Sequence, residues 1–498
     1  MTGDSKPEAP LRTAATIAEW IERFADTERI AIRFEGDDIT YRQLHRRIGA
    51  TAASLVGHGV SAGDRVAFCG LNRVELFESL FACAHLGVMF LPLNNRLTVT
   101  ELADQIEDSE PRVLLTTDSF HASLVEAARG RTVRDLDADP FPDAAPPPVG
   151  GSMAAPCLMM YTSGTTGRPK GAVLTQDAIA HTVANSLDHQ GLGADDRVIA
   201  PLPTFHVGGL NIQSLPTLSV GGQVLLQRRF EPGDVLDLID RYRPTQTLLV
   251  PAMLQAVAGH PRFATTDLSS LVGINTGSSI VPLHVMQPFF DRGVPVGQVY
   301  GATETGPTSV VLRYDEAAER PHSCGRPSPH TQVRIVDNEG VDVGVGVDGE
   351  LLVKGPNLFS SYWNNPVATD AAFIDGWYRT GDVGHCDADG YIVISDRLGD
   401  MVISGGENVY PAEVERVLGD HPAIAEIAVV GRPDPNWGET VVAVAVLRDG
   451  ATLSLEELRT WSDSRLARFK QPRSLELVDA LPRTALGKVR KNVVRQQL

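Results

Sequence analysis

The stretch that decides the fold is residues 157–175, CLMMYTSGTTGRPKGAVLT. Its apolar start predicts a buried strand, which runs directly into residues dense in Ser, Thr and Gly. Small residues let backbone N–H groups approach phosphate oxygens, hydroxyl groups add donors, and Lys170 adds a positive charge. The spacing is not that of the Walker sequence GxxxxGK[ST], because Gly171 stands where that sequence has Ser or Thr. The stretch therefore predicts a phosphate-binding loop of another kind, directly after a strand.

On both sides of this loop, helical stretches alternate with short apolar ones. Residues 13–60 are expected to be helical, while 64–70 (DRVAFCG) and 88–93 (VMFLPL) are expected to be buried strands. A second alternating run covers residues 157–313, and the Pro-rich segment 139–151 predicts a surface loop. This alternation is typical of α/β proteins with doubly wound parallel sheets.

The pattern changes in the last third of the chain. Residues 331–394 contain short strands separated by Gly and Asp turns, which indicates a small antiparallel sheet or barrel. The last hundred residues read as a separate α+β module. We therefore expect an N-terminal domain over residues 1–396, a hinge over 397–400 and a C-terminal domain over 401–498.

Charge and cysteine content narrow the class of protein. The 498 residues carry 44 Lys and Arg against 62 Asp and Glu, and this net charge of −18 argues against nucleic acid as the main ligand. The five cysteines are scattered without a CxxC pair, so reduced thiols are expected. The polar N-terminus does not resemble a signal peptide, and the most apolar stretch, 80–93, is shorter than the about 20 residues that a bilayer requires. We expect a cytoplasmic protein without a transmembrane segment.

The string TSGTTGRPKG resembles the phosphate loop of the adenylate-forming superfamily, which includes acyl-CoA synthetases, firefly luciferase and peptide-synthetase adenylation domains. Six further segments resemble motifs of this family in the same order: PTFH at 203–206, TGSS at 276–279, YGATETG at 300–306, WYRTGD at 377–382, DRLGDMVISGGENVYP at 396–411 and PRTALGKV at 482–489. The resemblance spans nearly the whole chain. It implies a large N-terminal domain with two doubly wound sheets and a small β-barrel, followed by a mobile C-terminal α+β domain.

The resemblance also implies a reaction, in which ATP and Mg²⁺ activate a carboxylic acid as an acyl-adenylate. Because the carboxylate and the α-phosphate are both anions, the site must neutralise charge and fix the line of attack. Glu304 would hold Mg²⁺, a hard cation that prefers oxygen ligands. The residues implied to hold the β- and γ-phosphates are Thr162, Ser163, Gly164, Thr165, Thr166 and Lys170.

Other positions are matched to the nucleotide, the acid and catalysis. The adenine and ribose would contact Gly277, Ser278, Tyr300, Gly301, Thr303, Asp382 and Arg397. The acyl pocket would be formed by His206, Val207, Gly208, Gly277 and Gly306. Lys488, with His206 and Thr166, would be catalytic, since its ammonium would meet the negative charge that builds in the transition state. Taken without the family, Lys488 reads equally as a solvated lysine in a basic tail, and Tyr300 as a core aromatic residue.

For the transfer to coenzyme A, the resemblance implies contacts from Gly406, Trp437, Phe469 and Arg473. A core aromatic pair and solvated charges are equally good interpretations of the last three. Two residues after Arg397 the family usually has Asp or Lys as the hinge, whereas this chain has Gly399. Because glycine samples positive φ easily, rotation at Gly399 stays feasible but is less restrained.

The small, uncharged residues after His206 favour a fatty or aromatic acid over an amino acid. A dicarboxylic acid held by Arg228 or Arg229 is an open alternative. Only ten residues follow Lys488, so we expect the acceptor to be a separate molecule, coenzyme A, or alternatively a separate carrier protein. A non-catalytic nucleotide-binding protein is the alternative from a different class. Monomer and homodimer both remain open.

Overall fold

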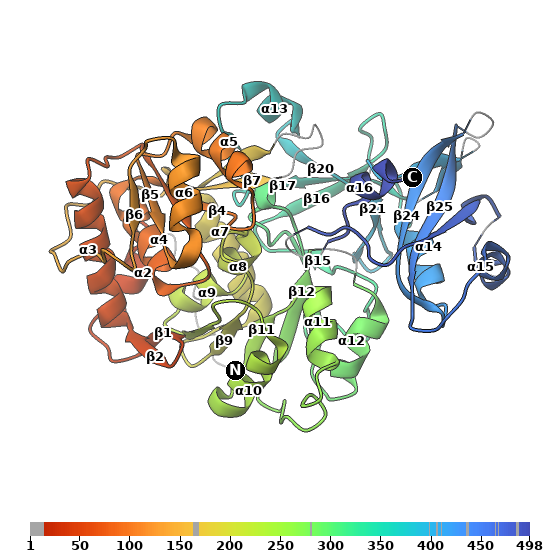
Figure 1. The fold of residues 1–498 in the computed structure, drawn as a ribbon, viewed down its shortest axis with the longest axis horizontal. Coiled ribbons are helices and arrows are strands. Elements are labelled where there is room, and N and C mark those ends of the chain that lie inside the picture. Colours follow the sequence, from red (N-terminus) through yellow and green to blue (C-terminus); the bar gives the residue numbers. More distant parts are fainter. Residues whose placement is uncertain are drawn as a thin grey trace.

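The computed structural model describes residues 14–162, 169–278, 281–397, 399–404, 407–409, 411–434, 438–463, 465–466, 468–484 and 488–498. Figure 1 shows a large body, which holds the residues up to β21, and a smaller unit at its right, which holds the last hundred residues. No helix in these described ranges is long and apolar enough to cross a bilayer.

Two large sheets form the body. The nine-stranded sheet has the spatial order β15 (Arg326–Pro327), β14 (Val310–Leu312), β13 (Val296–Tyr300), β12 (Gly273–Gly277), β11 (Gln246–Leu248), β9 (Arg197–Ala200), β10 (Gln223–Leu226), β1 (Ile30–Phe34) and β2 (Asp37–Thr40). The seven-stranded sheet has the order β18 (Ser361–Tyr362), β8 (Lys170–Thr175), β7 (Pro156–Thr162), β4 (Met89–Leu93), β3 (Arg65–Cys69), β5 (Val113–Thr116) and β6 (Val133–Asp135). The central strands of both are parallel. Antiparallel strands stand at both edges of the nine-stranded sheet and at the β18–β8 edge of the seven-stranded sheet, whereas its other edge strand, β6, pairs in parallel with β5.

The largest hydrophobic core lies between these sheets. It joins strand residues such as Val224 and Phe90 to the apolar faces of α3 (Tyr41–Gly57), α4 (Val74–Leu86) and α7 (Gln176–Gln190). The other helices of the body are α2 (Glu19–Glu22), α5 (Val99–Ser109), η1 (Asp118–Phe120), α6 (His121–Ala128), α8 (Val207–Asn211), α9 (Ser214–Ser219), α10 (Pro232–Tyr242), α11 (Pro251–Ala258), α12 (Leu283–Phe290), η2 (Thr303–Thr305) and α13 (Pro366–Ala371). This arrangement confirms the predicted α/β class.

The expected helix over residues 13–60 is partly wrong. Residues 30–40 form the hairpin of β1 and β2, and α3 begins only at Tyr41. The reason is a distant partner: Ile32 of β1 lies beside Val224 of β10 in a parallel pair. The expected strands at 64–70 and 88–93 are confirmed as β3 and β4.

A smaller sheet joins the body to the C-terminal unit. It contains β16 (Gln332–Val336), β17 (Gly349–Lys354), β20 (Trp377–Cys386) and β19 (Phe373–Ile374), and β21 (Ile392–Arg397) pairs with β20. All the pairs in it are antiparallel, as the change of pattern after residue 331 predicted.

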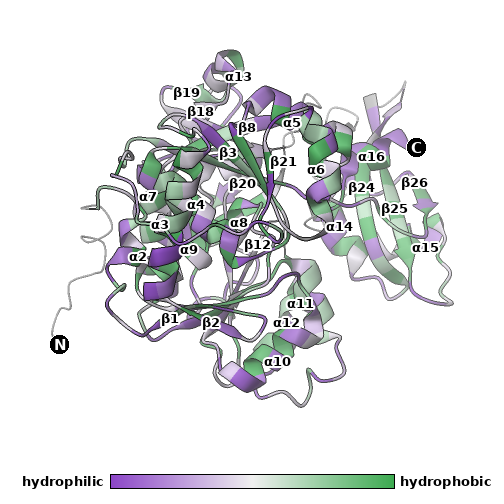
Figure 2. Cartoon of the chain, turned by 60° about the vertical axis from the view of Figure 1, so that its left-hand side comes forward, coloured by the Kyte–Doolittle hydropathy of each residue, from purple (hydrophilic) through white to green (hydrophobic). Residues whose placement is uncertain are grey.

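The C-terminal unit has a sheet and a core of its own. Its strands are β22 (Val402–Ser404), β23 (Glu407–Val409), β24 (Ile424–Asp434), β25 (Gly438–Leu447) and β26 (Ser474–Leu477), and its helices are α14 (Pro411–Gly419), α15 (Leu455–Ser462), η3 (Arg468–Lys470) and α16 (Lys491–Gln496). Hydrophobic residues run along β24 and β25 (Figure 2). In the described part of the chain, they pack in two clusters whose members all follow Met401.

Candidate active site

The two ends of the predicted phosphate loop lie side by side. Thr162 ends β7 and Lys170 begins β8, and the two residues are opposite each other in the antiparallel pair. The loop between them is therefore closed by a strand pair. Ser163, Gly164, Thr165 and Thr166 lie outside the described residues.

Glu304 lies next to this closure. It is in η2, directly after β13, and only 7% of it is exposed. Its Oε1 accepts hydrogen bonds from Thr162 Oγ1 at 3.2 Å and from Tyr362 Oη at 2.9 Å. The ammonium Nζ of Lys170 lies 4.4 Å from the centre of the Tyr362 ring, at cation–π distance. The structure therefore brings together Thr162, Lys170 and Glu304, and adds Tyr362.

Tyr362 was missed in the sequence. It stands in the segment SSYWNNP, whose aromatic residues read locally as core, and its contacts with Glu304 and Lys170 span 58 and 192 residues of chain (362 − 304 and 362 − 170). The dense aromatic composition of this segment, directly after the strand GELLVKG, was the only local signal.

Tyr300 and Asp382 form the second buried pair. Tyr300 Oη donates to Asp382 Oδ2 at 2.8 Å, and 8% of Asp382 is exposed. Burial, with the negative charge of Asp382, raises the pKa of Tyr300 well above its usual value, so the phenol stays a donor. Arg397 pairs with Asp382 in the strand register, although its side chain lies outside the description. Binding of a ribose hydroxyl by Asp382 and stacking of Tyr300 on adenine both stay predictions.

The other residues expected at the nucleotide lie at the ends of adjacent strands. Gly277 ends β12, and Ser278 follows with a φ of +77°, a strained value for a residue with a side chain. Gly301 and Thr303 follow β13 in the turn that leads to Glu304. The carboxyl ends of neighbouring parallel strands meet at one edge, which is where such folds bind ligands.

The expected acyl-binding residues begin at α8. His206 precedes the helix, its Nε2 is buried without a hydrogen-bond partner among the described residues, and burial lowers its pKa to about 4. Val207 is its first residue, and Gly208 faces Leu202 and Ile212, which belong to an apolar cluster. The imidazole of His206 is therefore neutral near pH 7.

The turn after Glu304 is tied to the same helix. Asn211 Nδ2 donates to the carbonyl of Gly306 at 2.8 Å. Gly306 has a φ of +97°, and a Cβ there would collide with the hydroxyl of Thr182, so only glycine fits. This hydrogen bond therefore links α8, which carries predicted acyl-binding residues, to the turn that carries Glu304, the predicted metal ligand.

The arginines considered for a dicarboxylic acid are engaged elsewhere. Arg228 makes a two-pronged ion pair with Glu35, at 2.6 and 2.5 Å. Arg229 lies 3.5 Å from Glu231 and is largely exposed. Because both arginines already pair with carboxylates of the chain, their contacts do not favour binding of a second carboxylate from a substrate.

The segment that carries Lys488 faces the body near α5. The side chain of Lys488 is exposed, and its backbone N donates to Thr484 Oγ1 at 3.1 Å. Hydrogen bonds from Thr98 lower the pKa of Glu101 in α5, and the positive charge of Arg490, two residues after Lys488, lowers it further. This places the C-terminal segment close to the first turn of α5.

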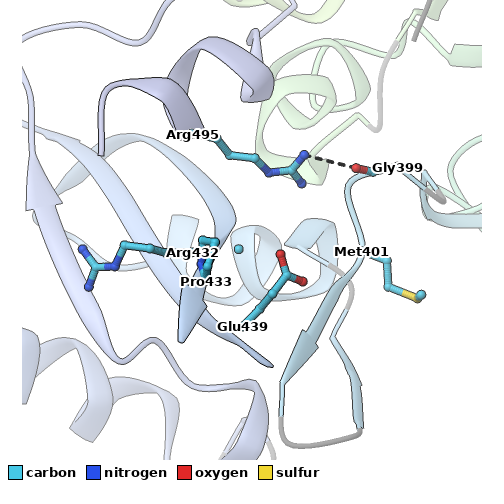
Figure 3. A pocket seen from close by; sticks show the side chains of 7 residues that line it. Gly399, Met401, Arg432, Pro433, Glu439 and Arg495 are labelled. Carbon is cyan, nitrogen blue, oxygen red and sulfur yellow. Dashed lines mark hydrogen bonds between the residues drawn. The ribbon is translucent and has the colours of Figure 1, made fainter. Parts of the chain in front are cut away.

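The segment in which the hinge is expected is bound by an arginine from the last helix. Arg495 of α16 donates from Nη1 to the carbonyl of Gly399 at 3.1 Å (Figure 3). Its Nη2 donates to the carbonyl of Asp400, also at 3.1 Å. Its Nη2 also lies 3.4 Å from Asp400 Oδ1. A Cβ on Gly399 would meet nothing within 4 Å. Arg495 was missed in the sequence because it read as part of a basic tail.

A pocket of about 310 Å³ adjoins this contact. Its lining residues are Gly399, Met401, Gly431, Arg432, Pro433, Glu439 and Arg495. In Figure 3 Glu439 points toward Arg495, whereas Arg432 and Met401 point away on opposite sides. In the expected hinge, the backbone of Gly399 therefore borders open space rather than packed side chains.

The residues expected to contact coenzyme A are only partly described. Gly406, Trp437 and the side chain of Phe469 lie outside the described residues. Arg473 is exposed, and its backbone N donates to the carbonyl of Val441. Their roles stay predictions.

A strand pair at the two ends of the expected phosphate loop, a buried carboxylate beside it and a second unit with a core of its own indicate an α/β enzyme of the adenylate-forming class. Family models agree: the AMP-binding enzyme model matches residues 17–363, and the AMP-binding enzyme C-terminal domain matches residues 413–488.

Curated relatives match over nearly their whole length. An indoleacetate–CoA ligase of Aromatoleum aromaticum is 45% identical, with 96% of this chain and 98% of the relative covered. A feruloyl-CoA synthase of Amycolatopsis is 43% identical, with 94% and 95% covered. A long-chain-fatty-acid–CoA ligase of Mycobacterium tuberculosis is 34% identical, with 98% and 97% covered.

Solved structures agree with the fold. ATP-bound MatB from Rhodopseudomonas palustris has a TM-score of 0.91 at 33% identity, with 97% of this chain and 98% of that chain covered. The o-succinylbenzoate CoA synthetase of Bacillus subtilis, in complex with its acyl-adenylate intermediate, has a TM-score of 0.87 at 35% identity, with 96% and 97% covered. The chain belongs to the AMP-binding enzyme family. It is an ATP-dependent acid–CoA ligase, as the sequence predicted.

Proposed function

We propose that this ligase activates an aromatic acid whose ring system carries a hydrogen-bond donor, such as an indole N–H or a phenol O–H. The relatives named for indoleacetate and for feruloyl-CoA share more residues with the chain than the fatty-acid ligase does. Both of these acids combine an apolar ring with one such donor.

The observation that carries this proposal is the side chain of Asn211. It is fully buried, its Nδ2 is used by Gly306, and its Oδ1 has no hydrogen-bond partner in the described part of the chain. Asn211 lies one helical turn after Val207 on α8. A buried acceptor without a partner costs about 1–3 kcal/mol, which a ring N–H or O–H would recover and an alkyl chain would not. Thr276 Oγ1, one residue before Gly277, is buried in the same unpaired state.

We also propose how the named residues divide the chemistry. Lys170, Thr162 and the loop residues hold the β- and γ-phosphates, and Asp382 holds the ribose. Lys488 brings positive charge to the attacking carboxylate and the α-phosphate. The thiol of coenzyme A then attacks the acyl carbon of the adenylate, and AMP leaves.

Glu304 suits Mg²⁺. Both of its hydrogen bonds from described residues use Oε1, so Oε2 is the oxygen that a hard cation would take. No cluster of three His, Cys, Asp or Glu that could hold a metal exists among the described residues, and such a site would complete its shell with ATP oxygens. The ion, when bound, supplies positive charge to the phosphates.

We further propose the boundary at residues 397–400, with Gly399 as the pivot. The separate cores before and after this segment support it. A cytoplasmic location and pairing into a homodimer stay predictions.

The test compares acids of similar shape with and without the donor. Indole-3-acetate is compared with 1-naphthaleneacetate, and ferulate with 3,4-dimethoxycinnamate, beside medium-chain and long-chain fatty acids, with pyrophosphate and thioester both measured. We expect kcat/KM to be about tenfold higher for the donor-bearing member of at least one pair, because one recovered hydrogen bond is worth about 1.4 kcal/mol. In Asn211→Leu this ratio should fall toward one, with unchanged melting temperature as the folding control. Equal rates within both pairs, or a preference for fatty acids, would contradict the proposed substrate class.

A further inference from the structure

Tyr362 touches two oppositely charged groups that the proposed nucleotide site needs. Its hydroxyl donates to Glu304 Oε1 at 2.9 Å, and its ring receives the ammonium of Lys170 at 4.4 Å from the ring centre. No ion pair joins Lys170 to Glu304 among the described side chains, although both contact the same tyrosine. The ring takes the cation, and the hydroxyl takes the anion.

The backbone around Tyr362 fixes this arrangement from both sides. β18 pairs with β8, the strand that starts at Lys170, and Trp363 N donates to the carbonyl of Gly171 at 2.7 Å. Phe359 N donates to the carbonyl of Glu304 at 2.8 Å. The short segment 359–363 therefore joins the strand that carries the lysine to the turn that carries the glutamate.

The side chain of Tyr362 has little freedom to move. Only 6% of it is exposed, and its ring packs at 4.8 Å between centres against Phe359, which also contacts Tyr378 and Phe373. Burial, with the nearby Glu304 carboxylate, raises the pKa of Tyr362, so its hydroxyl remains protonated and donating. A neutral, immobile group thus separates the two charges.

We propose that Tyr362 is a positioning residue that keeps Lys170 and Glu304 from neutralising each other, and so reserves the first for phosphate and the second for the metal. The inference rests on the proposed nucleotide site. An ammonium and a carboxylate at contact distance in a partly buried site attract each other strongly. If they paired directly, neither charge would be free for the metal–nucleotide complex.

Two substitutions separate the two contacts. Tyr362→Phe removes the bond to Glu304 and keeps the ring under Lys170. Tyr362→Leu removes both contacts and permits the direct ion pair. The matched control is Tyr391→Phe, because Tyr391 Oη donates to the carboxylate of Glu316 at 2.6 Å in a part of the body remote from this site.

The experiment measures binding on the full chain, without acid or coenzyme A. Calorimetry gives the affinity for ATP in EDTA and with excess Mg²⁺, and electron paramagnetic resonance gives the affinity of Mn²⁺ for the enzyme–ATP complex. Tyr362→Phe should weaken Mn²⁺ binding about tenfold and leave ATP binding in EDTA unchanged, since it removes one hydrogen bond to the charged carboxylate of Glu304. Tyr362→Leu should weaken both, and Tyr391→Phe should weaken neither.

The outcomes separate the inference from the proposed function. Absence of ATP binding in the unsubstituted enzyme would overturn the nucleotide site itself. Normal ATP binding with Mn²⁺ affinity unchanged in Tyr362→Phe would overturn only the role of Tyr362. An equal loss with and without metal in Tyr362→Phe, together with a lower melting temperature, would show a purely structural role and also overturn the inference.

Discussion

The proposed phosphate corner (Thr162, Lys170, Glu304 and Tyr362) and the proposed hinge at Gly399 are built in opposite ways. At the corner, Glu304 is nearly buried and receives hydrogen bonds from two elements, β7 and β18. At the hinge, Gly399 has no side chain, borders an open pocket and is held by Arg495, about a third of whose side chain is exposed. Charges that must act without reorganisation need a buried, hydrogen-bonded setting like that of Glu304. A segment that must change its dihedral angles needs an open, weakly restrained setting like that of Gly399.

Lys488 tests this difference most strongly, because it would act at the phosphate corner although it belongs to the C-terminal unit that we propose to move. Lys488→Ala should slow adenylate formation by about 100-fold or more, since it removes one charge at the developing anion. Transfer from added acyl-adenylate to coenzyme A should stay near the rate of the unsubstituted enzyme. Single-turnover assays of the two half-reactions measure this, and an equal loss in both would show that Lys488 is not confined to the first step.

Asp382 tests whether the rigidity of the nucleotide side matters for binding. Asp382→Asn keeps the shape but replaces a charged acceptor that serves Tyr300 and the proposed ribose contact. We expect KM for ATP to rise about tenfold or more, with a smaller change in KM for the acid. Asp389→Asn, at an exposed aspartate paired with Arg320, is the matched control. A change in the acid KM alone would remove Asp382 from the nucleotide site.

Local sequence patterns predicted much of this architecture. The apolar runs of β3 and β4 are present as expected. Such features depend on neighbours within a few residues. The hairpin of β1 and β2 was mistaken for helix because its stabilising partner, β10, lies far along the chain.

In the candidate site, too, some residues could be predicted from local sequence and others could not. Motif strings pointed to Thr162, Lys170, Glu304 and Asp382, and the first three lie together in the structure. The contacts that orient them come from Tyr362 and Tyr300, whose partners are set by strand register and cannot be inferred from spacing. Likewise the bond from Arg495 to the hinge depends on how α16 docks against β24, which no local pattern encodes.

Gly399→Pro tests whether the hinge is as free as its construction suggests. Proline fixes φ near −65° and should restrict the rotation that separates the two half-reactions. We expect thioester formation to slow about tenfold while adenylate formation changes less. Gly390→Pro is not a suitable control because that glycine has a positive φ, so Gly399→Ala, which has free space for its Cβ, serves instead. Equal slowing of both half-reactions by proline would contradict the assignment of the pivot.

The smallest effect is expected for Arg495. It bears most directly on the comparison between the phosphate corner and the proposed hinge. Because this contact is partly exposed, we expect its removal to cost only about 1 kcal/mol, which corresponds to a change of a few-fold in a rate ratio. The Arg495 contact restrains the arrangement of the C-terminal unit in which Arg490 lies near α5. Because Arg495→Ala removes this restraint, it should raise the rate of thioester formation relative to that of adenylate formation. Added salt should reduce the difference between the variant and the unsubstituted enzyme. Arg483→Ala, which removes another arginine ion pair of the C-terminal unit, is the control. A drop in melting temperature with an unchanged ratio would mean that Arg495 only fastens α16, and that the hinge is restrained elsewhere.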